Sequence, residues 1–383
     1  MIMRHTHLIE RSGKGRSLYG HDHALWRRFR RNSLIGLCAG CLSLLTPVWS
    51  QVNTYFGVNA RLWAQPNGNM KMDYDHVRQR FVIQYQYGTA PARYATLDLN
   101  TATYNHFVTA PEGNFQETLL TVMPTNWGSY AQGTTFVARA SGGKIFAIDP
   151  NGNVSTFASG LPSGGSGDLY TTVRWDAFGV ANHDLFYANA GTGDVLRIDP
   201  TGAVVWQTTL FDARYRRTAA PEPMIVLGSN PRWGPFQNKL LVGQNSVSDT
   251  FFVINPVTGQ VEASPQSSIG GSLESFRIFP FTGSNWALYV SIYNAGVYQL
   301  TNLTNIPNLQ PGDLFVAREL LGGGQVWHVY WDSATNSFVT QKIADFSNGF
   351  LEDMVFAPVP EPGSVTILLG LAGASMLARR RRR

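Results

Sequence analysis

KIFAIDPNG, residues 144–152, returns as DVLRIDPTG at residues 194–202, an offset of 50 residues. In both copies a short apolar run predicts a β-strand, and the Asp-Pro-x-Gly that follows predicts a tight turn. The Asp side chain can accept hydrogen bonds from the backbone after it, Pro presets φ, and Gly can adopt a positive φ. The pair therefore indicates one structural unit that the chain builds more than once.

Further copies extend this repeat over most of the chain. A third clear copy is FVINPVTG at residues 252–259, and weaker ones lie at residues 95–100, 296–301 and 329–332. Predicted strands precede the unit at residues 135–138, 184–188, 239–242 and 287–292, and earlier ones lie at residues 118–123, 169–175, 224–227 and 275–279. With the strand that follows each turn, this makes four strands in about 40–55 residues, which is typical of a β-propeller blade.

The predicted fold is all-β: a β-propeller over residues 51–357 with six blades, or seven as the alternative. No stretch of this region shows the sustained 3.6-residue periodicity of an amphipathic helix. Residues 351–356 match an innermost strand that has no blade after it. We expect this last strand to join the N-terminal strands and close the ring.

The repeated phrases resemble those of six-bladed propellers of the NHL and gluconolactonase/regucalcin/strictosidine-synthase-like kinds. Because the shared motifs shape the scaffold, the resemblance implies a fold and no particular reaction. For the lactonase type it also implies metal-binding asparagines and an aspartate on inner loops. Asn182 and Asp353 are the nearest counterparts in this chain.

The C-terminal segment has three parts in a fixed order. A proline-flanked glutamate, which stays extended, precedes 14 uncharged residues, 365–378, and five arginines end the chain. The uncharged run predicts a transmembrane helix of roughly 21 Å, shorter than the ~30 Å hydrocarbon core, and the arginines would hold its end on the cytoplasmic side. A buried C-terminal helix is the alternative. The motif is Pro360, Glu361 and Pro362, and the basic anchor is Arg379, Arg380, Arg381, Arg382 and Arg383.

This segment, residues 358–383, resembles the PEP-CTERM sorting signal. The resemblance implies that an exosortase, a membrane enzyme of Gram-negative bacteria that also make exopolysaccharide, cleaves the chain near the motif. The protein would then be held in the cell envelope before processing, and lie at the cell surface or outside the cell afterwards. The resemblance says little about the activity of the rest of the chain.

The N-terminal residues 1–50 predict a secretory signal peptide with a long basic n-region. An apolar run at residues 33–45 forms the h-region, and Val48 and Ser50 place the cleavage before Gln51. A signal anchor or a lipoprotein site at Cys41 are the alternatives. Because Cys38 and Cys41 both lie in the h-region, the mature chain would have no disulfide and no thiolate metal site.

The net charge of +5 comes from the two ends of the chain. Residues 1–50 contain eight basic and two acidic residues, and the C-terminus adds five arginines. Between them, residues 51–378 contain 17 Lys and Arg against 23 Asp and Glu, a net charge of −6. The sequence therefore gives no electrostatic support for nucleic-acid binding.

Motifs of the common catalytic classes, such as H-E-x-x-H, G-x-S-x-G and the phosphate-binding loop, do not occur. The sequence predicts no catalytic residue, and whether the protein is an enzyme stays open. The stretch Arg214-Tyr215-Arg216-Arg217 either binds an anionic sugar or forms a solvated loop. Trp233 and Trp327 either stack on a sugar or pack in the core.

One set of acidic residues falls at the predicted start of each innermost strand. Because these strand starts lie at one end of the central channel, the carboxylates would converge there and attract a hard cation. If a cofactor binds there, we expect calcium, with Glu222, Glu274 and Glu352 as its ligands. The alternative is that the acids only cap turns. The Gly-Asp-Leu context favours this alternative for Asp168 and Asp313. The full set is Glu117, Asp168, Glu222, Glu274, Asp313 and Glu352.

Three functions are compatible with these observations. The first is an exported binding or scaffold protein of the cell envelope or the exopolysaccharide matrix, whose partners are an exosortase-type enzyme, the membrane, and a polysaccharide or envelope protein. The second is a metal-dependent periplasmic hydrolase of the lactonase type. The third is a structural spacer with neither ligand nor activity.

Overall fold

The computed structural model describes residues 52–66, 68–86, 91–110, 117–139, 142–163, 170–280 and 285–359. All of them belong to one compact unit. The predicted signal peptide, sorting motif, membrane helix and arginine cluster lie outside the described residues. So do Asp168 and the side chain of Glu117.

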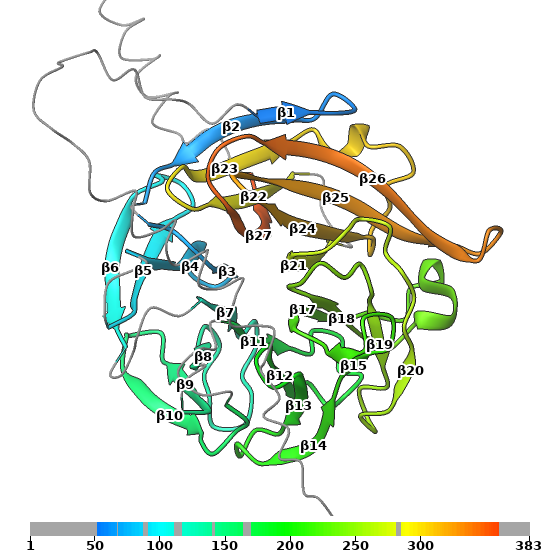
Figure 1. Ribbon diagram of the computed structural model, residues 1–383. Coiled ribbons are helices and arrows are strands. Elements are labelled where there is room, and N and C mark those ends of the chain that lie inside the picture. Colours follow the sequence, from blue (N-terminus) through cyan, green and yellow to red (C-terminus); the bar gives the residue numbers. More distant parts are fainter. Residues whose placement is uncertain are drawn as a thin grey trace, which may run out of the picture. The chain divides into compact units, whose positions relative to one another are not determined.

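The described residues form an all-β structure with a propeller-like arrangement of sheets and only two short 3-10 helices, η1 (Pro231–Phe236) and η2 (Leu303–Asn305) (Figure 1). One four-stranded sheet contains β3 (Met72–Asp75), β4 (Arg80–Tyr85), β5 (Arg93–Asp98) and β6 (Tyr104–Thr109). Another contains β17 (Pro221–Val226), β18 (Leu240–Gln244), β19 (Phe252–Ile254) and β20 (Val261–Ala263). The eight-stranded sheet contains β7 (Glu117–Val122), β8 (Thr135–Arg139), β9 (Lys144–Ile148), β10 (Val154–Ala158), β11 (Tyr170–Trp175), β12 (Leu185–Asn189), β13 (Asp194–Ile198) and β14 (Val204–Thr209).

Two further sheets combine strands from both ends of the described chain. In the five-stranded sheet, the order is β21 (Leu273–Ile278), β24 (Leu314–Leu320), β25 (Gly323–Asp332), β26 (Ser337–Phe346) and β1 (Val52–Thr54). In the other, the order is β27 (Leu351–Pro358), β22 (Trp286–Ile292), β23 (Gly296–Thr301) and β2 (Asn59–Ala64). A two-stranded hairpin, β15 (Phe211–Asp212) and β16 (Arg217–Thr218), lies between β14 and β17 in the sequence.

The strands β3, β17, β21 and β27 form the inner edges of their sheets, and β7 and β11 are the two middle strands of the eight-stranded sheet and the innermost strands of its two halves (Figure 1). Strand β7 pairs in parallel with β11, and each of the others packs beside the next inner strand. The last strand, β27, and the N-terminal strand β2 form the two edges of one sheet, so the two ends of the described chain join in the same sheet as the sequence predicted.

The repeated phrases occupy equivalent places in the fold. The strands β5, β9, β13, β19, β23 and β25 are each the third strand from the inner edge of their part of a sheet. In the turn after β9, Asp149 Oδ1 accepts hydrogen bonds of 2.8 Å from the backbone N–H of Asn151 and of Asn153. In the turn after β13, Asp199 Oδ1 accepts one of 2.8 Å from the backbone N–H of Thr201. The predicted turn chemistry is therefore confirmed.

One predicted pairing is wrong. The spacing placed residues 275–279 and 287–292 in one blade, but β21 pairs with β24, and β22 pairs with β27 and β23. The chain thus leaves the five-stranded sheet after β21, forms β22 and β23 in the neighbouring sheet, and then returns for β24, β25 and β26. Repeat spacing cannot reveal this exchange, because strand pairing depends on partners far away in the sequence.

Candidate functional site

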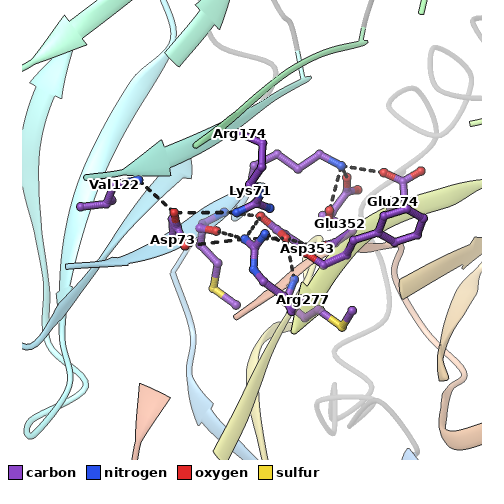
Figure 2. A network of polar contacts seen from close by, with 12 residues as sticks. Lys71, Asp73, Val122, Arg174, Glu274, Arg277, Glu352 and Asp353 are labelled. Atoms are coloured by element: carbon purple, nitrogen blue, oxygen red, sulfur yellow. Dashed lines mark hydrogen bonds and ion pairs between the residues drawn. The ribbon is translucent and has the colours of Figure 1, made fainter. Parts of the chain in front are cut away.

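The inner strands bring three of the predicted glutamates together around a lysine. Lys71, directly before β3, places its Nζ 3.1 Å from Glu222 Oε1, 2.6 Å from Glu274 Oε2 and 3.8 Å from Glu352 Oε2. The ammonium also donates a hydrogen bond of 2.7 Å to the backbone carbonyl of Glu352. Figure 2 shows Lys71 reaching Glu274 and Glu352. Together with Asn245, these four residues are called the central cluster below.

Each glutamate of the central cluster lies at an irregularity near the start of its strand. The pairing register shifts between Pro221 and Met224 in β17, between Leu273 and Ser275 in β21, and opposite Glu352 in β27. A bulged residue leaves the regular alternation of side chains, so a bulge can redirect a side chain that would otherwise follow the pleat. The bulges therefore account for how three strands direct carboxylates at one ammonium.

The central cluster is closed to solvent. The side chain of Lys71 is 0% exposed, and those of the three glutamates are at most 3% exposed. Asn245 Nδ2 donates hydrogen bonds of 2.5 Å to Glu222 Oε2 and 3.0 Å to Glu274 Oε1. Burial, and secondarily the charge of Glu274, raises the pKa of Glu222 to about 8, although Lys71 opposes the shift. At neutral pH Glu222 therefore holds a proton, which removes one of the three buried negative charges.

A second polar group continues from the cluster on the same strands. Asp353, next to Glu352, accepts hydrogen bonds at Oδ1 from Ser275 Oγ (2.5 Å) and Arg277 Nη2 (3.2 Å), and at Oδ2 from the backbone N–H of Met72 (2.9 Å). Burial raises the pKa of Asp353 against the opposing charges of Arg277 and Lys71. These bonds join β3, β21 and β27.

Asp73 extends these contacts to two more inner strands. Its carboxylate lies 3.8 Å from Arg277 Nη2 and 4.0 Å from Arg174 Nη1, and its Oδ2 accepts a hydrogen bond of 2.9 Å from the backbone N–H of Val122 (Figure 2). Arg174 lies on β11 and Val122 on β7. These polar groups thus link the inner strands to one another through hydrogen bonds and ion pairs, in which their charges are paired with one another.

The predicted acidic residues have different outcomes. Glu222, Glu274 and Glu352 converge, as expected. Asp313 does not join them: it is buried beside β24 and accepts from His328 Nε2 at 2.8 Å, pairs with Arg232, and caps a turn by accepting from the backbone N–H of Gln310 at 2.9 Å. The prediction that Asp313 starts an innermost strand is wrong, because β24 is the second strand of its sheet, next to the inner strand β21. Its hydrogen bond from Gln310 is a turn cap, as in the alternative.

Lys71 was missed by reasoning from the sequence, although a signal was present. It is a lone charge in Asn69-Met70-Lys71-Met72, directly before β3. Lys is almost never fully buried unless it is paired, so a lysine between two apolar residues at a strand start indicates an internal partner.

Among the residues that the structure describes, no group of three or more His, Cys, Asp or Glu side chains is arranged to hold a metal ion. In the central cluster, the positive charge among the carboxylates is Lys71. Calcium binding at Glu222, Glu274 and Glu352 stays an untested prediction. Asn182 and Asp353, the nearest counterparts of the lactonase metal ligands, lie in different environments. Asn182 lies in an exposed turn with φ 58°, and Asp353 is buried.

The predicted sugar-binding candidates are also placed. Trp233 is 1% exposed and donates a hydrogen bond of 3.0 Å from Nε1 to the backbone carbonyl of Gly312, which favours the core alternative. Trp327 packs partly buried against the core between the β17 and β24 sheets. The stretch from Arg214 to Arg217 forms the tip of the β15–β16 hairpin.

Comparison with known proteins assigns the C-terminal segment. Residues 358–383 match the model of the PEP-CTERM protein-sorting motif. This chain carries a PEP-CTERM sorting signal. The motif implies export, C-terminal anchoring in the membrane, and processing by an exosortase. No helix in the described part of the chain is long and apolar enough to span a membrane, and the predicted helix at residues 365–378 lies outside that part.

No curated protein matches the sequence. Among solved structures, a streptogramin B lyase matches with a TM-score of 0.43 and 12% identity over 80% of this chain and 99% of its own. A gluconolactonase from Xanthomonas campestris matches with a TM-score of 0.44 and 14% identity over 81% of this chain and 90% of its own. A virginiamycin B lyase from Staphylococcus aureus matches with a TM-score of 0.43 and 12% identity over 76% of this chain and 99% of its own. At these values the likeness carries no conclusion about activity.

Proposed function

We propose that this protein is an exported, exosortase-processed binding or scaffold protein of the cell envelope or the extracellular matrix. The observation that carries the proposal is the sorting motif at residues 358–383 on a propeller-like body. A signal peptide at residues 1–50 would start export, and the helix at residues 365–378 would hold the precursor until the exosortase cuts. The sheets would count as six blades, with the eight-stranded sheet contributing two.

The central cluster supports a binding role over catalysis. A catalytic acid, base or metal ligand must reach a substrate, whereas Lys71, Glu222, Glu274 and Glu352 are closed to solvent and bond to one another. These groups stabilise the contact between inner strands. The binding surface is therefore expected on the exposed loops and hairpins around them.

Retention and turnover distinguish the two functional classes. The full chain, purified in detergent, would be passed over immobilised cell-envelope polysaccharide and over envelope protein, and lactone hydrolysis would be followed with and without calcium. We expect retention on one of the two materials and no calcium-dependent hydrolysis. Turnover of a lactone that requires calcium, without retention, would instead establish the metal-dependent hydrolase.

A further inference from the structure

The β15–β16 hairpin, residues 211–218, presents a basic surface on a body whose net charge is −6. Three arginines lie within four residues at its tip, whereas residues 51–378 contain 17 basic residues in all. Phe211, at the start of the hairpin, is 58% exposed, and the nearby Val247 is 71% exposed. The hairpin thus combines clustered positive charge with an exposed aromatic ring.

The hairpin is held in a fixed shape. Asp212 is buried, accepts hydrogen bonds at Oδ1 from the backbone N–H groups of Arg214 (3.1 Å) and Tyr215 (3.3 Å), and accepts one at Oδ2 from Gln244 Nε2 (2.9 Å). Gln244 ends β18, and the next residue is Asn245 of the central cluster. The tip is therefore anchored to the same end of the sheet that carries Glu222.

The aromatic ring of Tyr215 lies beside the guanidinium groups of two of the arginines. The guanidinium carbons of Arg214 and Arg217 lie 5.5 Å and 5.2 Å from the centroid of its ring. Attraction to the ring offsets part of the repulsion between the two like charges. Arg217 Nε and Nη2 are shielded from solvent, and neither finds a hydrogen-bond acceptor among the described residues. These two nitrogens therefore face the protein, and the ring contacts hold the guanidinium of Arg217 beside that of Arg214.

The guanidinium groups of Arg214 and Arg216 can pair with a ligand. Arg214 is half-exposed and pairs with Asp249 at 2.7 Å, a surface pair that a competing carboxylate can replace at little cost. Arg216 is exposed and has no hydrogen bond or ion pair to any residue that the structure describes. It adopts φ 51°, a left-handed conformation that helps to form the tight tip.

We propose that this hairpin binds a polysaccharide that carries carboxylate groups. The planar guanidinium forks pair with sugar carboxylates through charge-assisted hydrogen bonds, and Phe211 packs against the apolar C–H face of a sugar ring. A polymer with a carboxylate on successive sugars engages several arginines at once, which raises its avidity over that of a single sugar. This inference rests on the proposed function, because it names the partner class for an envelope-binding protein.

The test measures binding of the full chain in detergent to alginate, a polyuronate, with neutral dextran and polyglutamate as the other probes. The hairpin variant is Arg214→Gln/Arg216→Gln/Arg217→Gln. The matched control, Arg379→Gln/Arg380→Gln/Arg381→Gln, removes the same charge from the C-terminus. Since Arg217 is partly buried, Arg216→Gln and Phe211→Ser alone are included, and the melting temperature of every variant is recorded.

We expect the wild type to bind alginate and to ignore dextran. The hairpin variant should bind at least about tenfold more weakly, since it loses the charge-assisted hydrogen bonds of the arginines. Arg216→Gln and Phe211→Ser should each weaken binding with an unchanged melting temperature, and the C-terminal control should bind like the wild type.

Three results would overturn the inference: no alginate binding by the wild type, equal losses in the hairpin and C-terminal variants, or tighter binding to polyglutamate, which would assign the hairpin to an acidic protein. None of these decides the proposed function, which is tested by retention on envelope polysaccharide and envelope protein. A wild type that binds neither alginate nor the envelope polysaccharide and envelope protein would refute both this inference and the proposed function.

Discussion

Replacing Lys71 by methionine should destabilise the protein strongly, because it removes the only cation of the central cluster and keeps a chain of similar length. The ammonium lies 2.6 Å from the carboxylate of Glu274, and both side chains are buried. At an effective dielectric constant of about 20, two unit charges about 3 Å apart attract by roughly 5 kcal/mol. Proton uptake by the glutamates offsets part of this loss, and removing one partner of a buried ion pair typically costs about 3–5 kcal/mol.

The matched variant is Glu222→Gln. Because the pKa of Glu222 is raised to about 8, its carboxyl group is neutral at pH 7, and the amide replaces a neutral group of the same shape. We expect a change in the free energy of unfolding of only about 1 kcal/mol, the worth of one rearranged hydrogen bond. The difference between the two variants isolates the charge of Lys71 from the packing of its neighbours.

The assay is urea unfolding of the full chain, followed by tryptophan fluorescence at pH 5.5 and pH 8.5. The urea midpoint of Lys71→Met should fall at both values and fall further at pH 8.5, where the freed carboxylates hold their protons less readily. A midpoint for Lys71→Met equal to that of the wild type, or a loss that is the same at both pH values, would refute the electrostatic reasoning.

Three further outcomes are expected. The free energy of unfolding of the wild type should fall by several kcal/mol as the pH rises from about 4.5 to about 8, because over this range folded Glu222 keeps the proton that the unfolded chain releases. A free energy of unfolding that rises over this range would contradict the raised pKa of Glu222. Gly202→Ala should lower the melting temperature more than Gly142→Ala, although both positions have positive φ. At Gly202 the added Cβ would lie 2.5 Å from the carbonyl oxygen of Phe157, whereas at Gly142 it would meet nothing within 4 Å. Replacing the five C-terminal arginines by serines should abolish retention of the precursor in the membrane fraction, and an unchanged fraction would argue against anchoring by this segment.

The sequence was informative wherever the physics is local. The Asp-Pro-x-Gly phrases predicted a strand and a turn because Asp149, Asp199 and the glycines act within a few residues of themselves. The convergence of Glu222, Glu274 and Glu352 was also predictable, because acids at the starts of inner strands must meet at one end of a propeller.

What could not be predicted depends on contacts between distant segments. The Nζ of Lys71 meets Glu352 across 281 positions of sequence, and no local pattern identifies that partner. Likewise, β22 pairs with β27 instead of β21 because a long antiparallel register forms there, and strand spacing is the same for either choice. The shielding of the Arg217 nitrogens likewise depends on how the folded hairpin packs, which no local pattern specifies.

The most direct test of the proposed function is the intact mass of the protein recovered from outside the cells of a host that contains an exosortase. We expect a chain that starts at Gln51 and ends near Pro360–Pro362, and that is missing from the surface fraction when the exosortase gene is deleted. A surface-exposed chain that still ends at Arg383, in either host, would contradict the proposal that this protein is sorted by its PEP-CTERM segment.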